Sequence, residues 1–231
     1  MKIPIKGVIV PNDEKWIYEE LFGIETTTPN DVNKLIEEAD GEELEVIINS
    51  PGGDVYSGSE IYTALMDYNG PVNVKIVGVA ASAASVIAMA GGVTKISPTA
   101  QIMIHNVTET ASGDYRYFEH EAEVLKNYNK SIANAYMLKT GMSEKELLKM
   151  MDEETWLTAQ KAKEYGFVDE IMFDTGNKLA ANMGNFMLPP EVINKIRENF
   201  ADGKIGKSNA KSDKLKLYKA RLNLLKLRSV N

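Results

Sequence analysis

The first hundred residues alternate between short apolar runs and amphipathic segments. The apolar runs have the length of strands and cover residues 3–10, 44–49, 72–77, 95–97 and 101–105. Between them, residues 28–39 and 57–68 carry apolar positions at helical spacing. This alternation predicts the α/β class, with stacked βαβ units and a parallel sheet. The run LEVIIN at 44–49 is nearly continuous, which is typical of a strand covered on both faces.

Capping signals mark the ends of several predicted helices. Thr28 is followed by a proline and, three residues after it, by an acid, which is the pattern of a helix start, and Gly41 ends that helix. The sequence SEKE at 143–146 is a second capping box and predicts a helix as far as residue 151. Residues 155–173 then predict a capped helix and a final strand.

The hydrophobic pattern changes between residues 114 and 139. Apolar residues recur there every three or four positions, which predicts one long helix whose narrow seam meets partner helices. After Phe173 the compact pattern stops. We therefore place a domain boundary at that point, with residues 1–173 as the main domain and residues 174–231 as a C-terminal extension.

The extension is basic, whereas the rest of the chain is acidic. From residue 204 to the end there are nine Lys or Arg and one acid, so this stretch carries +8 and the remainder −15 of the net charge of −7. Residues 214–228 predict a basic amphipathic helix. Such a helix favours a protein partner or packing on the acidic body, and the alternative is a segment that is disordered in isolation. Nucleic acid and membrane are disfavoured as partners, because aromatic residues are nearly absent from it.

Composition narrows the setting in which the chain works. None of the 231 residues is cysteine, which excludes disulfides and thiolate metal sites and is typical of a reducing compartment. The first residues lack the apolar core of a signal peptide, and no apolar run approaches the roughly 18–20 residues of a membrane span. We therefore expect a cytoplasmic protein.

Residues 77–92 read VGVAASAASVIAMAGG, a run of small residues that contains two serines. One interpretation is a buried helix packed closely on the sheet. The other is that Ser82 or Ser85 is a nucleophile at the helix start, where free N–H groups can hold an oxyanion. His105 ends a predicted strand, where α/β proteins place their sites, whereas His120 lies among glutamates and is interpreted as a surface residue.

Four motifs, in this order and spacing, resemble those of the ClpP family of serine peptidases. They are INSPGGDVYSG at 48–58, GVAASAAS at 78–85, MIH at 103–105 and LTAQKAKEYGFVDEI at 157–171. The resemblance implies a ClpP/crotonase-like fold over roughly residues 3–173 and no metal or organic cofactor. It also implies that the long helix is a handle through which two rings of subunits meet face to face.

The resemblance assigns roles to individual residues. Ser82 is implied to be the nucleophile and His105 the base that takes its proton, with Ser85 as a packing residue. The N–H groups of Gly53 and Ala83 are implied to form the oxyanion hole. The loop after residues 44–49, which contains Gly52 and Asp54, is expected to bind a peptide substrate as an added strand.

The third member of the triad departs from the family pattern. The family has an aspartate two positions before the aromatic residue of this motif, and here Glu154 stands two positions before Trp156. A glutamate can also accept the second N–H of the histidine. We predict that Glu154 orients His105, with Asp152 as the alternative orienter and a merely solvated acidic loop as the remaining possibility.

The branch of the family determines the expected partners. The stretch ETWLTA and the start of the chain at the first strand resemble phage and prophage members, which are similar to head maturation proteases. This favours a capsid or scaffold protein as substrate. A housekeeping subunit served by a ring ATPase is the alternative. The short N-terminus and the lack of an ATP-binding motif give that partnership no support in the sequence. Two rival classes are a crotonase-type enzyme that acts on acyl-CoA and a non-catalytic ring or scaffold protein.

Overall fold

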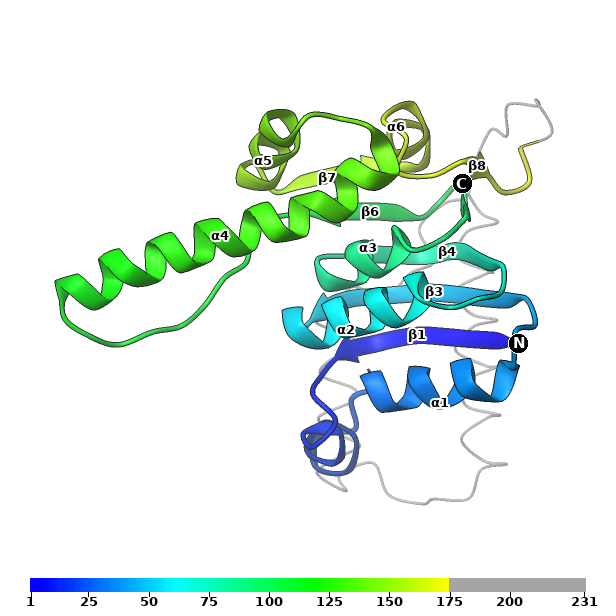
Figure 1. Cartoon of the computed structure of the whole chain (residues 1–231), viewed down its shortest axis with the longest axis horizontal. Helices are drawn as coiled ribbons and strands as arrows, with labels where there is room; N and C mark the ends of the chain where they lie inside the picture. Colours follow the sequence, from blue (N-terminus) through cyan, green and yellow to red (C-terminus); the bar gives the residue numbers. More distant parts are fainter. Residues whose placement is uncertain (175–231) are drawn as a thin grey trace, which may run out of the picture. The chain divides into compact units, whose positions relative to one another are not determined.

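Eight strands form one sheet in the computed structural model, which describes residues 1–174 (Figure 1). They are β1 (Lys2–Ile9), β2 (Thr26–Thr27), β3 (Leu44–Gly53), β4 (Val72–Ala81), β5 (Val93–Ile96), β6 (Gln101–Ile104), β7 (Thr155–Thr158) and β8 (Glu170–Ile171). The order β2-β1-β3-β4-β5-β8 is parallel throughout, and β6 pairs with β4 in parallel and with β7 antiparallel. The α/β class is confirmed. The basic helix predicted at 214–228 lies outside the described residues.

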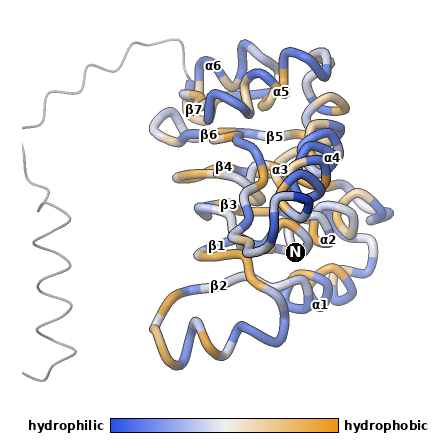
Figure 2. Tube along the Cα trace, turned by 90° about the vertical axis from the view of Figure 1, so that its left-hand side faces the viewer, coloured by the Kyte–Doolittle hydropathy of each residue, from blue (hydrophilic) through white to orange (hydrophobic). Residues whose placement is uncertain are grey.

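The helices connect these strands. They are α1 (Pro29–Ala39), α2 (Val55–Met66), α3 (Ala83–Ala88), α4 (Tyr115–Thr140), α5 (Glu144–Asp152) and α6 (Ala159–Glu164), with a short π-helix, η1 (Ile17–Leu21). Figure 2 shows α1 to α4 on the same side of the sheet. Right-handed crossovers between neighbouring parallel strands place α1, α2 and α3 on one side in this way, whereas α4 lies between β6 and β7, which are antiparallel.

The prediction that the strand at 44–49 is covered on both faces is wrong for the described part of the chain. Leu44, Val46 and Ile48 are fully buried beneath the helices. Glu45 alternates with them, is only half-buried and pairs with Lys75 of β4. The strand therefore follows the period of two expected when helices cover one face only.

Both capping boxes are present at the helix starts where they were predicted. The Thr28 side chain accepts from the Asp31 N–H, and the Asp31 carboxylate accepts from the Thr28 N–H in return. Ser143 and Glu146 make the same reciprocal pair at the start of α5. These pairs satisfy N–H groups that have no acceptor within the helix, which is why the two boundaries could be read from the sequence.

Strand β4 serves two neighbours along one edge, and this arrangement positions the later site. Residues 73–76 pair with β5, and residues 79–81 pair with β6. The register of β4 against β3 shifts between these two halves, and the side-chain oxygen of Asn49 accepts from the Val79 N–H at 3.2 Å in the shifted stretch. The two halves of β4 thus pair with different strands. Strand β6 lies beside the second half, which leads into α3.

Helix α4 forms without interruption over the range predicted for one long helix. Its buried residues are Ala133, Ala135 and Tyr136, all in its C-terminal half, and most of its first half is exposed.

Among residues 1–174, no helix is both long and apolar enough to cross a membrane.

An ion pair fastens the end of α4 to the sheet. Lys139 Nζ lies 2.9 Å from Asp169 Oδ2, and the same oxygen accepts from the Thr94 N–H of β5 at 2.6 Å. Burial opposes ionisation of this carboxyl, but Lys139 and the Thr94 N–H outweigh it and hold the pKa of Asp169 below its ordinary value of 3.8. The pair joins α4 to the edge formed by β5 and β8.

Replacing Asp169 by Asn should weaken this attachment in a pH-dependent way. Because the folded-state pKa is lowered, the contribution of the carboxylate is fully present above pH 3.8 and is lost as the pH falls through the lower folded-state value. We expect Asp169→Asn to lower the free energy of unfolding by about 1 kcal/mol at pH 7, and we expect the difference from wild type to shrink below about pH 4. Denaturant unfolding at pH 7 and pH 3 measures it.

The control is Glu153→Gln, which removes an exposed helical ion pair with Lys149. That change should alter stability by less than about 0.5 kcal/mol at either pH. A difference between wild type and Asp169→Asn that is equal at both pH values would contradict the account of the Lys139–Asp169 pair.

Candidate active site

Ser82 occupies a strained turn between β4 and α3. Its backbone angles are φ 53° and ψ −126°, in a region that residues other than glycine rarely adopt. Two neighbouring glycines make room for this turn. A Cβ on Gly52 would lie 2.5 Å from the Ala81 carbonyl oxygen and 2.7 Å from Ser82 Cβ, and a Cβ on Gly58 would lie 2.8 Å from Ala83 Cβ.

His105 reaches Ser82 from the end of the adjacent strand. Ala81 pairs with Met103, and the Ser82 N–H donates to the Met103 carbonyl at 2.9 Å. The ends of β4 and β6 therefore reach the same edge of the sheet. His105 Nε2 lies 2.7 Å from Ser82 Oγ, within hydrogen-bond distance. The structure therefore brings together the two residues that the sequence nominated as nucleophile and base.

Ser85 is inaccessible and is held by hydrogen bonds. Its side chain is fully buried; Oγ donates to the Ser82 carbonyl at 2.6 Å and lies 2.7 Å from the hydroxyl of Tyr136. Burial raises the pKa of Tyr136 far above its ordinary value, although the hydrogen bond to Ser85 acts in the opposite direction, so the phenol is neutral. The interpretation of Ser85 as a packing residue is confirmed, and it supports the turn that carries Ser82.

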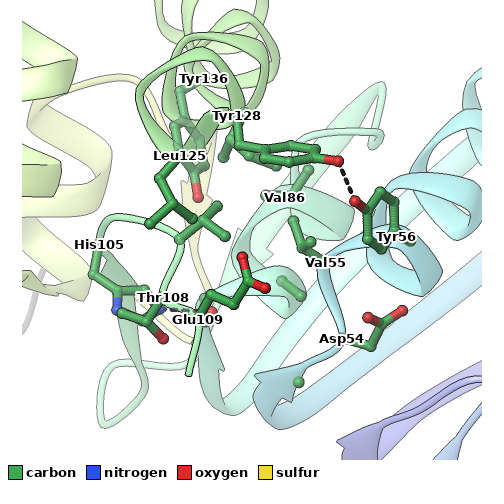
Figure 3. A pocket seen from close by; sticks show the side chains of 15 residues that line it. Asp54, Val55, Tyr56, Val86, His105, Thr108, Glu109, Leu125, Tyr128 and Tyr136 are labelled. Carbon is green, nitrogen blue, oxygen red and sulfur yellow. Dashed lines mark hydrogen bonds between the residues drawn. The ribbon is translucent and has the colours of Figure 1, made fainter. Parts of the chain in front are cut away.

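A pocket of about 380 Å³ opens beside the serine and the histidine (Figure 3). Beyond these two residues, its lining is mostly apolar. The remaining lining residues are Gly53, Asp54, Val55, Tyr56, Ala83, Val86, Val107, Thr108, Glu109, Leu125, Tyr128, Ile132 and Tyr136. Helix α4 supplies four of them, which explains why its attachment to the sheet matters for the site.

Gly53, Ala83 and Asp54 lie at this pocket for identifiable reasons. Gly53 has φ 150°, and a Cβ there would lie 2.0 Å from the Ile9 carbonyl oxygen, so only glycine fits so close to β1. Ala83 is the first residue of α3, where N–H groups have no acceptor within the helix. The carboxylate of Asp54 caps α2 by accepting from the N–H and hydroxyl of Ser57, both at 2.7 Å.

The contact predicted between Glu154 and His105 is not present in the structure. Glu154 Oε1 accepts from the Trp156 indole at 3.3 Å, and Asp152 Oδ1 accepts from the Asn106 amide at 2.8 Å. Glu154 has φ 48°, a left-handed backbone conformation that residues other than glycine adopt uncommonly. Within the described residues, His105 therefore has no carboxylate hydrogen-bonded to it.

Glu154 and His105 are nevertheless both adjacent to the last pair of the β6–β7 ladder. In this antiparallel pair, Ile104 lies opposite Thr155. His105 follows Ile104 in the chain and Glu154 precedes Thr155, so both residues leave the ladder at the same end. Strand β7 was missed in the sequence analysis, because the four residues TWLT are too short for their alternation to stand out.

The structure also adds residues that the sequence analysis did not nominate. Tyr56 and Tyr128 meet across the pocket, with their hydroxyl groups in contact. The helical seam predicted over residues 114–139 includes position 128 or 129, but no sequence pattern paired Tyr128 with Tyr56. His120 is exposed on α4, as predicted. In residues 1–174, no three His, Cys, Asp or Glu side chains gather closely enough to hold a metal ion.

A serine beside a histidine, at the carboxyl edge of a mainly parallel sheet and next to an apolar pocket, is the arrangement of a serine hydrolase. The family model described as Clp protease matches residues 26–175 of the chain. The chain belongs to the Clp protease family, a family of serine endopeptidases. The predicted family and the ClpP-like fold are thereby confirmed.

Individual relatives agree with this assignment. The chain is 37% identical over 134 residues to the ATP-dependent Clp protease proteolytic subunit of Pleurastrum terricola. The aligned region covers 57% of this chain and 68% of that protein. The protein of the same name from Bacteroides fragilis is 35% identical over 134 residues, with 57% and 65% covered. The chain thus spans about two thirds of the length of these relatives.

A solved structure extends the likeness to the fold. A ClpP1 mutant from Listeria monocytogenes is similar with a TM-score of 0.61 at 26% sequence identity, covering 76% of this chain and 92% of that one. The long helix α4 and the parallel sheet are thus features of a known architecture.

Replacing Gly52 by Ala should disturb Ser82 directly. The added methyl group would overlap the Ala81 carbonyl and Ser82 Cβ, and it would also strain a backbone with φ 92°. We expect the rate of Ser82 acylation by a p-nitrophenyl ester to fall by about 100-fold, because a displacement of about 1 Å has this effect on reacting groups.

Gly41→Ala is the matched control. Gly41 also has positive φ, at 86°, but nothing lies within 4 Å of the position of its Cβ. This variant should lose some stability and keep the wild-type acylation rate. Equal acylation rates in Gly52→Ala and wild type would contradict the role given to Gly52.

Proposed function

We propose that this protein is a serine endopeptidase in which Ser82 and His105 carry out peptide hydrolysis. The observation that carries the proposal is the 2.7 Å approach of His105 Nε2 to Ser82 Oγ at the mouth of a pocket of about 380 Å³. Membership of the Clp protease family supports it. The pocket is apolar enough to receive the side chain of a peptide while the peptide bond lies at the serine.

The proposed reaction begins with attack of Ser82 Oγ on the carbonyl carbon of the peptide bond. His105 Nε2 takes the hydroxyl proton and then delivers it to the leaving amine, so that an acyl group remains on Ser82. Water, deprotonated by the same nitrogen, hydrolyses this ester and restores the serine. The strained turn supports this role, because it holds Oγ out from the sheet and toward His105.

The tetrahedral oxyanion would be held by the N–H groups of Gly53 and Ala83. Both residues line the pocket next to Ser82, and Ala83 lies at the start of α3, where the helix presents unpaired donors. Donors fixed in this way need no reorganisation when the charge develops, which is the main source of their effect on rate. The preceding Gly52 and the following Asp54 would shape the loop along which the peptide lies.

We assign the orientation of His105 to Glu154. The register of β6 and β7 supports this assignment, because Glu154 and His105 directly adjoin the paired residues Thr155 and Ile104 at the same end of the ladder. A rotation of the Glu154 side chain away from the Trp156 indole would be needed to form the hydrogen bond. Asp152 is the weaker candidate, since its carboxylate is already bound by the Asn106 amide.

We propose that the subunit works in a ring. Its substrates are either polypeptides delivered by a separate ring ATPase or the capsid or scaffold proteins of an assembling particle. The names of the relatives, ATP-dependent Clp protease proteolytic subunits, support the first of these partners. The phage head maturation branch, the capsid or scaffold substrate and a cytoplasmic location rest on the sequence patterns alone. The rival classes, an acyl-CoA enzyme and a non-catalytic scaffold, are disfavoured by the close approach of Ser82 and His105.

Replacing either Ser82 or His105 by Ala should abolish hydrolysis of a fluorogenic peptide. We expect kcat/KM to fall by at least about 1,000-fold in each variant, with little further loss in the double variant, because the two residues act as a unit. Ser97→Ala and His120→Ala remove the same residue types away from the pocket and should behave as wild type. Retention of hydrolysis in Ser82→Ala would contradict the proposal.

Glu154→Gln and Asp152→Asn should show which of the two carboxylates orients His105. A neutral amide stabilises the protonated histidine less well, so we expect kcat to fall by roughly 100-fold or more while KM changes little. Asp152→Asn should reduce kcat by less than about tenfold. If Asp152→Asn has the larger effect, Asp152 and not Glu154 is the third member of the triad.

A further inference from the structure

The connection between β6 and α4 brings a carboxylate to the pocket beside Ser82. Glu109 lies in this connection, four residues after His105, and it lines the pocket. Figure 3 shows its carboxylate pointing into the pocket on the side of Tyr56. Within residues 1–174, this carboxylate takes part in no hydrogen bond and no ion pair. A charged acceptor therefore faces the space beside the nucleophile and is free to bind a group of the substrate.

No positive side chain balances this charge inside the pocket. Among the described residues, neither a lysine nor an arginine belongs to the lining. The other acid of the lining, Asp54, already accepts hydrogen bonds from the N–H and the hydroxyl of Ser57. Glu109 is thus the carboxylate of the pocket that a basic group of the substrate can pair with.

The phenol of Tyr56 reports the negative potential on this side of the pocket. Its pKa is raised above the ordinary value of 10.0, mainly by the hydrogen bond with Tyr128 and then by burial. The carboxylates of Asp54 and Glu109 raise it further, because negative charge nearby disfavours the phenolate. Both carboxylates therefore act on the space beside Tyr56, where a cation would be stabilised.

The other walls of the pocket are apolar. Val86, Leu125 and Ile132 line it, and its volume of about 380 Å³ leaves room for a long side chain. Lysine and arginine bury their methylene groups along apolar surface while the charged end stays with water or a partner. A pocket with apolar walls and one unpaired carboxylate is complementary to such a side chain. An acidic side chain would instead be repelled by Glu109.

We propose that Glu109 selects a lysine or arginine side chain at the residue before the cleaved bond, by pairing its carboxylate with the basic group. The proposal rests on the proposed peptidase function and adds a specificity-determining residue to it. The methylene groups of the substrate contact the apolar walls, and the ammonium or guanidinium group donates to the Glu109 carboxylate. Hydrogen bonds between two charged groups are about twice as strong as neutral ones, so this contact distinguishes a basic side chain from an apolar one of the same length.

The test compares fluorogenic peptides that differ only in having lysine, norleucine or glutamate before the cleaved bond. Norleucine has the four-carbon chain of lysine without the ammonium group. For the wild type, we expect kcat/KM for lysine to exceed that for norleucine by about tenfold and that for glutamate by at least about 100-fold. In Glu109→Gln, the lysine-to-norleucine ratio should fall to about one, because the amide carries no charge.

Charge reversal and a matched control sharpen this comparison. Glu109→Lys should reverse the order, so that the glutamate peptide is cleaved faster than the lysine peptide. Glu37→Gln removes an exposed carboxylate of α1 that does not line the pocket, and it should keep the wild-type ratio. Added salt should reduce the lysine preference of the wild type and leave the ratio of Glu109→Gln unchanged.

A lysine-to-norleucine ratio that is the same in wild type and in Glu109→Gln would overturn the proposal, as would a wild-type preference for norleucine. Cleavage of the norleucine peptide in either case would leave the peptidase function standing. If no peptide is cleaved, calorimetry on Ser82→Ala decides, by comparing the lysine and norleucine peptides with and without Glu109→Gln. Tighter binding of the lysine peptide that disappears with Glu109→Gln supports the proposal. Equal binding of the two peptides, or no binding of either, overturns it.

Discussion

The pairing of β4 with β6 is the constraint on which the rest of the site depends. Because Ala81 lies opposite Met103 and the Ser82 N–H binds the Met103 carbonyl, the serine and His105 leave the sheet at the same point. The first half of β4 is paired with β5 and the second half with β6, so β6 lies next to the half of β4 that leads to Ser82. The distance of 2.7 Å between the two side chains thus depends on sheet topology, which brings the two strand ends together, and on the turn at Ser82, which directs Oγ toward His105.

The strain at Ser82 persists because the elements on either side of it are held firmly. Every residue of α3 is buried, and β4 is paired on both edges just before the turn. The turn cannot relax without moving one of these elements, which is how a fold can store strain at a functional position. Gly52 and Gly58 leave room for the turn at Ser82, as the glycines that flank the nucleophile in sequence do in other serine hydrolases. Here the two glycines belong to β3 and α2 instead.

Much of this could be predicted from the sequence, and the reasons are local. The capping boxes at Thr28 and Ser143, the apolar runs and the helical seam of α4 are signals carried by residues close together in the chain, so the elements and the α/β class followed from them. Their positions at predicted strand ends made a serine of residues 77–92 and His105 candidates, but the choice of Ser82 over Ser85 came from the resemblance of four motifs to the ClpP family. The positive φ of Ser82 could not be predicted, since the glycines that permit it lie 30 and 24 positions earlier. The direction of the Glu154 side chain and the meeting of Tyr56 with Tyr128 depend on tertiary packing, which no local pattern encodes.

The most direct test of the central claim, that Ser82 is an activated nucleophile, is covalent labelling of the purified protein with a fluorophosphonate, read by intact mass. The account predicts one adduct per chain on wild type and on Ser85→Ala, and none on Ser82→Ala. Since Ser85 is buried and hydrogen-bonded to Tyr136, it should not react even when Ser82 is absent. A folded wild-type protein that takes up no label, or a Ser82→Ala protein that still takes it up, would contradict the account.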